Sequence, residues 1–421
     1  MNTDATTTGR PSPLWRNRDY MLFWSGRTVS ALGTNMSSIA FPLLILALTR
    51  SAALAGLAGG LRAIPYVLLS LPAGVLVDHW DRKRVMLLCD TARALTLGSI
   101  PVAWLVGHLS VAQLYAATTI EGTLLLFYNT ANHSSLPRLV PREQLAAASA
   151  QDEGAYYAAS LVGPAVGGAL YQVGRVLPFL GDALSYLVSV LSLLLIKADL
   201  RQENLGGATR PRHLSAGMLE GLTWLWRQPI IRAVSLLDTA DTLVASGLSL
   251  VVIILAQQHH ASPTTIGTIF SIAGVGGVLG SVTGAQVQKR ASFGQTVIGV
   301  RWALAALWPL YAIAPNALAL GAITAAIYFV NPIKNVAYVS YCLPLIPDGL
   351  RGRVTTAWDL LPSVANVAGA SLSGLALQAI GPQATIVIGA VIVLALALGI
   401  TLHAPIRNAP SLHASRESDL S

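Results

Sequence analysis

Charged residues are what this sequence has least of. Lys, Arg, Asp and Glu make up 11% of its 421 residues, whereas 53% are apolar, and the mean hydropathy is +0.59. An ordinary soluble protein carries roughly 25% charged residues. The chain therefore lacks the charge to cover a large water-exposed surface, which argues against a large soluble enzyme and against a disordered chain. We expect a protein whose solvent is mostly lipid.

Cysteine and recognisable catalytic motifs are also scarce. The two cysteines, Cys89 and Cys342, lie in apolar stretches and imply no disulfide framework. The polar segment 1–19 does not resemble a cleavable signal peptide. No Gly-x4-Gly-Lys-Ser/Thr phosphate loop occurs, and no nucleophile–base arrangement stands out. The sequence thus predicts no enzyme activity, no cofactor and no metal site.

Twelve apolar segments are long enough to cross a bilayer core, which needs about 20 residues of helix. A polar interruption at 197–229 divides them into six and six. We therefore predict an all-α membrane protein of twelve transmembrane helices in two six-helix bundles, 20–196 and 230–403. The interruption is the linker, and 1–19 and 404–421 are tails. The predicted helices cover 20–48, 53–77, 85–106, 111–132, 145–172, 176–196, 230–256, 262–287, 293–313, 317–340, 354–379 and 383–403.

Basic residues indicate which side of the membrane each loop faces. With the N-terminus inside, the outer loops carry only Arg50 and Arg175, and the inner loops carry the other loop-borne Lys and Arg side chains. Both termini are thus predicted to be cytoplasmic, with the chain in the inner (cytoplasmic) membrane. The formal net charge of +8 is then a topology signal, and no nucleic-acid partner is expected.

The two halves of the chain repeat one pattern. Gly74 and Gly284 end the second segment of each half, Arg93 and Arg301 lie in the third, and further matches follow in the same order at a nearly constant offset. Each half has an even number of segments, so the copies share one topology and form a parallel repeat about an axis normal to the membrane. Such halves can rock about a central cavity, which is the physical basis of alternating access.

The loop after the second segment carries Gly74, Asp78, Asp81 and a basic run at 82–84. Together with the twelve segments and the repeat, this loop resembles the loop 2–3 signature of the major facilitator superfamily. Asp81 stands where the signature usually has Gly, a departure that is similar to the macrolide-efflux and enterobactin-exporter branch. The resemblance covers essentially the whole chain and implies the major facilitator fold and a transport function.

Small residues in segment 145–172 resemble the antiporter signature of drug exporters. Glycine lets helix backbones approach closely, and proline allows a kink. The resemblance implies export, although helix packing alone also explains small residues. The signature residues are Gly154, Gly163, Pro164, Gly167 and Gly168.

Ionisable side chains inside the segments are costly in hydrocarbon, so each needs a partner or a wet cavity. Glu121 and Arg62 lie at similar depths near the membrane midplane, and each is a candidate to neutralise the other. Two interpretations stay open for Glu121: it exchanges a proton during transport, or it forms a permanent ion pair. Thr118 stands where many drug–proton antiporters carry Arg, so a proton relay built on that Arg does not transfer.

Asp238 and Asp241 are three residues apart and share a helical face. Two acids on one face suit proton coupling or a cationic substrate, and a polar lining of an inner vestibule is the alternative. The family resemblance implies that the first and seventh segments face each other, in which case Arg27 can meet either acid. The proton-coupling candidates are therefore Glu121, Asp238 and Asp241.

Aromatic and amide side chains predict the substrate cavity. Four of them in segment 317–340 follow a 3-4-3 spacing and form one stripe, which suits a broad amphipathic ligand. Anchoring at the membrane interface is the alternative. The cavity candidates are Arg27, Asn35, Arg62, Phe127, Tyr128, Tyr328, Asn331, Lys334, Asn335 and Tyr338.

Charges near the inner ends of the segments predict a conformational latch. Asp90 and Arg93 are three residues apart, and we expect them to join a cytoplasmic network with the loop at 78–84. Glu153 and Asp359 occupy equivalent places in the two halves and are candidate latch partners. The predicted latch residues are Gly74, Asp78, Asp81, Arg82, Lys83, Arg84, Asp90, Arg93, Glu153 and Asp359.

These features favour a secondary active transporter that exports a small amphipathic molecule, such as a drug, a secondary metabolite or a siderophore, by proton-coupled alternating access. The expected partners are that substrate, protons and the lipid bilayer, and we expect a monomer. Two alternatives stay open: a translocator of lysophospholipid-like lipids, and a transporter-like receptor or assembly protein that moves nothing.

Overall fold

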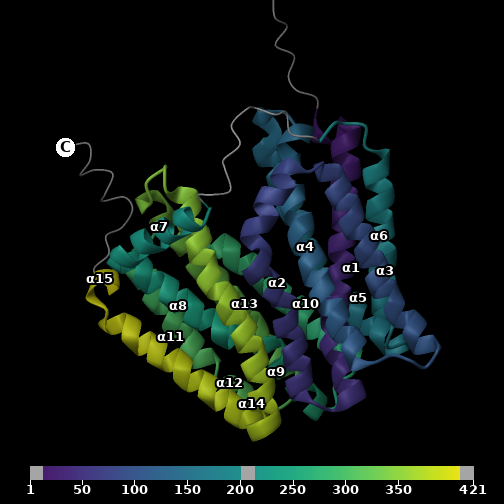
Figure 1. The fold of residues 1–421 in the computed structure, drawn as a ribbon. Helices are drawn as coiled ribbons and strands as arrows, with labels where there is room; N and C mark the ends of the chain where they lie inside the picture. The colour runs from purple at the N-terminus through teal and green to yellow at the C-terminus, as the bar shows by residue number, and fades with distance from the viewer. Residues whose placement is uncertain (1–12, 201–213, 408–421) are drawn as a thin grey trace, which may run out of the picture.

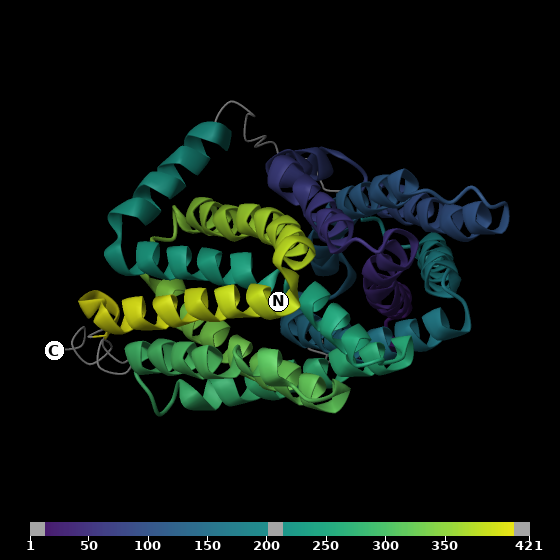
Figure 2. The same ribbon diagram turned by 90° about the horizontal axis from the view of Figure 1, so that it is seen from below.

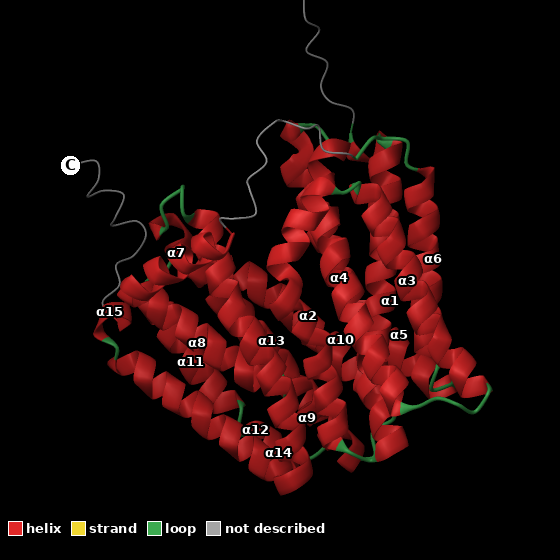
Figure 3. Ribbon diagram, viewed as in Figure 1, coloured by secondary structure: helices red, strands yellow, loops and turns green. Residues whose placement is uncertain are grey.

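The computed structural model describes residues 13–200 and 214–407, and all of their side chains except those of Leu71, Asp78 and residues 214–218. Within these ranges the chain is helical and contains no strand (Figure 3). This confirms the all-α prediction.

Six long helices form the N-terminal half. Polar caps fix where several of them begin: the side chains of Ser51, Asp81 and Ser110 each accept a hydrogen bond from the backbone N–H three residues further on. The helices are α1 (Arg18–Thr49), α2 (Ala52–His79), α3 (Arg82–Leu105), α4 (Val111–Leu139), α5 (Leu145–Val173) and α6 (Leu177–Leu195).

The C-terminal half also crosses six times, but only α10 and α13 are single, uninterrupted crossings. Gly381 adopts a positive φ of 79° just before Pro382, and this kink divides the 52-residue α14 into two crossings. Two further crossings are interrupted near Gly247 and at Pro309. The elements are α8 (Pro229–Ala245) with α9 (Leu248–Gln258), α10 (Pro263–Val287), α11 (Phe293–Leu307) with α12 (Leu310–Ile313), α13 (Ala317–Cys342), α14 (Arg351–Leu402) and the short α15 (Ala404–Arg407).

The described residues contain nine helical stretches that are long and apolar enough to cross a membrane. The α14 helix counts once among them although its kink makes two crossings, and α4 and α5 fall short because polar side chains such as Glu121, Asn132 and Glu153 dilute them. The fold is nevertheless the predicted one: twelve membrane helices in two six-helix bundles.

The predicted linker, 197–229, contains a helix that was not predicted from the sequence. The α7 helix (Leu214–Arg227) packs against the start of α14, where the backbone carbonyl of Arg353 lies against Gly221. The Glu220 carboxylate and the Arg353 guanidinium are 2.5 Å apart. The predicted linker thus ends in an ordered helix attached to the C-terminal bundle (Figure 1).

The two bundles touch through glycine contacts near one end of the molecule. The start of α2 meets α14, where a Cβ on Gly56 would lie 2.6 Å from the Cα of Gly374. The end of α5 meets α10, where a Cβ on Gly168 would lie 3.1 Å from the Cα of Gly267. Both contacts lie at the end where α1 stops and α2 begins. Toward the opposite end, which carries α7 and α15, the bundles diverge (Figure 1), and seen from below they lie side by side (Figure 2).

The small residues of α5 divide between two neighbours. Gly163 and Gly167 lie against Asn35 and Met36 of α1, and Pro164 and Gly168 lie against α10 of the other bundle. Gly154 has no neighbouring atom within 4 Å of a Cβ added to it. The antiporter-like signature therefore marks a junction of three helices that includes the contact between bundles.

Candidate functional site

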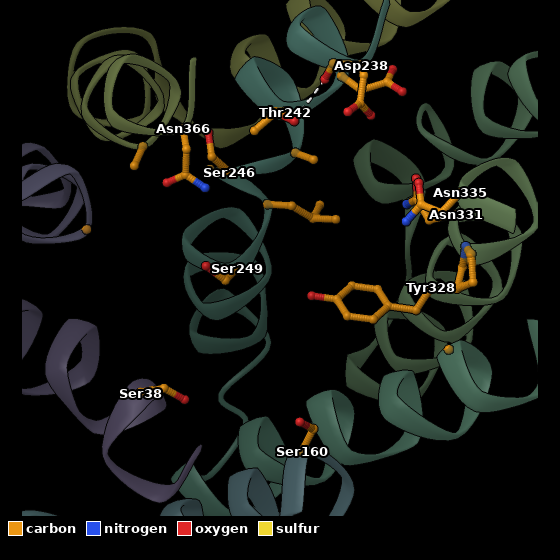
Figure 4. Close-up of a pocket in the computed structure, with 18 of the residues that line it drawn as sticks. Ser38, Ser160, Asp238, Thr242, Ser246, Ser249, Tyr328, Asn331, Asn335 and Asn366 are labelled. Atoms are coloured by element: carbon orange, nitrogen blue, oxygen red, sulfur yellow. Dashed lines mark hydrogen bonds between the residues drawn. The ribbon is translucent and has the colours of Figure 1, made fainter. Parts of the chain in front are cut away.

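A cavity of about 1540 Å³ lies between the two bundles. Helices α1, α2, α4 and α5 form one wall, and α8, α9, α10, α13 and α14 form the other. Figure 4 shows the polar groups that face it, with Ser38 and Ser160 on one side and Asp238, Asn331 and Asn335 on the other. The cavity lies where the parallel repeat predicts it, between two halves that can rock.

The aromatic and amide stripe of α13 faces this cavity. Its 3-4-3 spacing places one side chain per helical turn on the same face, and the Tyr328 ring extends from that face into the space (Figure 4). Among the cavity candidates, those that line it are Asn35, Arg62, Tyr328, Asn331, Lys334, Asn335 and Tyr338.

Three cavity candidates lie elsewhere. Arg27 forms an ion pair with Asp152 of α5, so the expected meeting of Arg27 with the acids of α8 is wrong. Phe127 stacks on Trp80 with ring centroids 6.4 Å apart. Tyr128 is buried inside the N-terminal bundle, where its ring lies 5.9 Å from the Arg93 guanidinium. These three side chains face other helices of their own bundle. Counting residues gives the depth of a side chain in the membrane but not the direction in which it points around the helix axis.

The two acids of α8 share one cation, as their common face predicts. The Lys334 ammonium lies 2.5 Å from an Asp241 oxygen and 3.1 Å from an Asp238 oxygen. Arg301 of α11 also forms an ion pair with Asp241 and donates a hydrogen bond to the Tyr338 hydroxyl at 3.2 Å. Asp238, Asp241 and Lys334 therefore form a charge network at the wall of the cavity, and Arg301 supports it from behind.

Glu121 lies in a second network, inside the N-terminal bundle. The Arg93 guanidinium donates to both of its oxygens, at 2.7 and 2.9 Å, and both side chains are 1% exposed. Arg62, the predicted partner, is more distant at 3.8 Å, and Tyr186 donates to Glu121 at 3.1 Å. The geometry of this conformation favours the ion-pair interpretation of Glu121.

The position of Arg93 corrects its predicted place in the cytoplasmic latch. Arg93 and Asp90 are 3.5 Å apart and buried within the bundle, facing Glu121 rather than the loop at 78–84. The sequence did contain a signal for this role, because the internal repeat matches Arg93 with Arg301, and each of these buried arginines pairs with an acid of a neighbouring helix. Tyr186 and Thr34, which also contact this network, were not among the predicted site residues.

The other latch candidates hold the N-terminal bundle together or line the cavity. Arg82 donates to the Ser134 carbonyl and Lys83 to the Ile196 carbonyl, each at 2.7 Å. Asp81 caps α3 and lies 3.4 Å from Arg84. Asp359 lines the cavity, Glu153 is exposed on α5, Gly74 lies on α2, and the side chain of Asp78 is outside the described part of the structure.

Two six-helix bundles that enclose a central cavity and bury charge networks define a membrane transporter. The chain belongs to the transmembrane secretion effector family, whose model matches residues 8–419, within the major facilitator superfamily. It is a multi-pass membrane transporter and not an enzyme, because the family and its relatives are transporters.

Known proteins resemble the chain over most of its length. It is similar to the multidrug efflux pump Tap of Mycobacterium tuberculosis, with 29% identity over 411 residues and 93% of each chain covered. It is also similar to the enterobactin exporter EntS of Shigella boydii, with 24% identity over 83% of this chain and 82% of the relative. Its fold resembles that of a bacterial homologue of the human lysosomal transporter Spinster, with a TM-score of 0.73, 15% identity, and 94% and 98% of the two chains covered.

Proposed function

We propose that the protein exports a small amphipathic molecule across the cytoplasmic membrane of a bacterium, driven by proton entry, with both termini in the cytoplasm. The observation that carries the proposal is the cavity between the bundles, faced by the aromatic and amide stripe of α13. The similarity to two exporters supports the outward direction.

The chemistry of the cavity wall supports an amphipathic substrate. Tyr328 offers an aromatic face, and Asn331 and Asn335 offer amide donors and acceptors. Lys334 and Asp238 place opposite charges beside each other, so neither sign dominates the wall. Such a surface suits a molecule with an apolar body and a few polar groups rather than a strongly charged ion.

The conformation supports loading from the side that carries α7 and α15. The bundles are closed by the contacts of Gly56 with Gly374 and of Gly168 with Gly267, at the opposite end. With both termini cytoplasmic, the cavity is open to the cytoplasm. Rocking about the closed end then exposes the same cavity to the outside.

Transport into reconstituted vesicles tests the proposal. Purified protein is placed in liposomes with an acidic interior, and uptake of ethidium, erythromycin and enterobactin is measured separately. One proton exchanged per substrate molecule gives about tenfold accumulation per pH unit, so we expect at least one probe to accumulate and to stop when the gradient is collapsed. Tyr328→Ala should weaken that uptake, whereas Trp15→Ala, on an exposed residue outside the cavity, should not.

The same vesicles also distinguish export of a small molecule from the two alternative functions. Gradient-independent movement of a fluorescent lysophospholipid, without accumulation of any of the three probes, would replace the proposal with lipid translocation. Absence of all flux from protein that is folded and reconstituted would indicate a receptor or assembly protein.

A further inference from the structure

Asp182 of α6 is a buried acid that the transport site described above does not include. Its side chain is 0% exposed, and it lies about 8 Å, at 1.5 Å per residue, from the start of α6 at Leu177. That end of α6 is the one at which the bundles touch, opposite the open end of the cavity. Asp182 is therefore close to the outer side of the membrane in the proposed orientation.

The Asp182 carboxyl group lies in a close-fitting pocket between α1 and α6. One oxygen lies 2.5 Å from the Ser37 hydroxyl, and the other lies 3.3 Å from the Ser185 hydroxyl. Opposite them stands Gly33, where an added Cβ would lie 2.5 Å from the carboxyl oxygen. Glycine at this position of α1 leaves the space that the carboxyl group fills.

The charges around Asp182 do not balance. Three buried acids, Asp90, Glu121 and Asp182, face one buried base, Arg93, which binds Glu121 through two nitrogen atoms. The only other cation in the described part of this network is Arg62, which is partly exposed and lies 3.8 Å from Glu121. Among the described residues Asp182 has no ion-pair partner. In the C-terminal bundle, by contrast, Asp238 and Asp241 both have an ion-pair partner, in Lys334 or Arg301.

The hydroxyl hydrogens near Asp182 also fit a neutral acid. Ser37 has one hydrogen to donate, yet its oxygen lies within bonding distance of both the Thr34 carbonyl, at 3.2 Å, and Asp182. If Asp182 carries a proton, it donates to Ser37 and Ser37 donates to Thr34, so both contacts are satisfied. A fully buried carboxylate without a cation costs several kcal/mol, and binding a proton removes that cost.

We propose that Asp182 is a proton-binding site of this transporter and that it holds its proton in the present conformation. Its neighbours are Ser37 and Gly33 of α1, Arg93 of α3, Glu121 of α4, and Tyr186 of its own helix. The role of this proton in driving transport rests on the proposed function, whereas the protonation itself does not. Since Asp182 lies outside the lining of the cavity, the proton and the substrate occupy separate sites.

Infrared difference spectroscopy of the purified protein tests the protonation without any substrate. At pH 7 the wild type should show the carbonyl band of a protonated carboxylic acid, and Asp182→Asn should lose it. The matched control Asp238→Asn should keep the band, because Asp238 is paired with Lys334. Ser37→Ala should keep the band but shift its frequency, and this variant retains the acid if Asp182→Asn does not fold. A band that persists in folded Asp182→Asn, or that disappears in Asp90→Asn instead, would overturn the proposal.

The vesicle assay tests the role in transport. Asp182→Asn should exchange the transported probe across the membrane within about twofold of the wild-type rate, but its accumulation should fall from about tenfold per pH unit to none. Full gradient-driven accumulation in this variant would refute the coupling role. If the wild type itself moves no probe against a gradient while the band still depends on Asp182, the proposed function fails and the proton site stands.

Discussion

At the scale of single residues, each bundle buries one arginine against an acid. Arg93 pairs with Glu121 in the N-terminal bundle, and Arg301 pairs with Asp241 in the C-terminal bundle. Both guanidinium groups also contact a tyrosine: Arg93 lies 4.0 Å from the Tyr186 ring, and Arg301 donates to Tyr338. The two halves of the internal repeat thus share one arrangement, in which a buried arginine contacts a carboxylate and a tyrosine.

Removing the charge of Glu121 should destabilise the protein strongly. Glu121→Gln leaves the Arg93 guanidinium buried without its carboxylate, and breaking a buried ion pair by removing one partner costs about 3–5 kcal/mol. We expect a lower unfolding temperature in detergent, and partial rescue in the double variant Glu121→Gln with Arg93→Met. Equal stability of the wild type and Glu121→Gln would show that the pair is not a structural element of this bundle.

The sequence predicted part of this chemistry and missed part of it. Depth along a helix follows from residue counting, so the neighbourhood of Arg62 and Glu121 was predictable, and so was the shared face of Asp238 and Asp241. Counting residues does not give the direction in which a side chain points around the helix axis. For this reason Arg93 was predicted to join the cytoplasmic network with the loop at 78–84. Asp182 was not predicted as a site residue, because it lies near the start of a helix and no charged residue stands three or four positions away from it.

At the scale of helices, hydropathy located all twelve crossings but not their irregularities. The kink at Gly381 and the breaks at Gly247 and Pro309 depend on local backbone geometry within continuous apolar sequence. The α7 helix was missed because its apolar side chains, such as buried Leu225, alternate with polar ones and do not form a long apolar run. Its order depends on packing against α14.

The glycine contact between α2 and α14 should control which conformation the protein adopts. Gly56→Ala places a methyl group against the backbone of Gly374, and overpacking of this kind costs about 1–3 kcal/mol. We expect the closed end to open in this variant, so that a cysteine introduced at Gln378 reacts faster with a water-soluble maleimide. Gly154→Ala is the matched control, since it meets no atom within 4 Å. Equal labelling rates in both variants would refute a gating role for the contact.

The kink of α14 should depend on glycine. Gly381 combines a φ of 79° with a ψ of 170°, a backbone region essentially restricted to glycine that costs other residues about 1–3 kcal/mol, so Gly381→Ala should lower the thermal unfolding temperature. Gly399→Ala lies on the same helix without positive φ or a close neighbour, and it should be neutral or slightly stabilising. An unchanged unfolding temperature in Gly381→Ala would mean that the kink is held by Pro382 alone.

At the scale of the whole molecule, the proposed orientation follows from the distribution of basic residues. Exposed single cysteines at His108 and at Glu143 lie in loops predicted to face opposite sides of the membrane. With Cys89 and Cys342 replaced by serine, an impermeant maleimide added to intact cells should label the His108→Cys variant and not the Glu143→Cys variant. Labelling of Glu143→Cys alone would reverse the orientation and with it the proposed direction of transport.

The proposed transport mechanism requires that the two bundles expose one cavity to the two sides in turn, under the control of a proton. Pulsed electron paramagnetic resonance can measure this through spin labels on the two bundles. One pair, at Glu143 between α4 and α5 and Asp348 between α13 and α14, lies near the open end, and one pair, at His108 between α3 and α4 and His260 between α9 and α10, lies at the closed end. Raising the pH removes the proton from Asp182 and leaves a buried charge, so it should disfavour the present conformation. We predict that the first pair then approaches while the second separates, and that Asp182→Asn abolishes this response. Distances that do not change with pH in the wild type, or two pairs that move in the same direction, would contradict the claim.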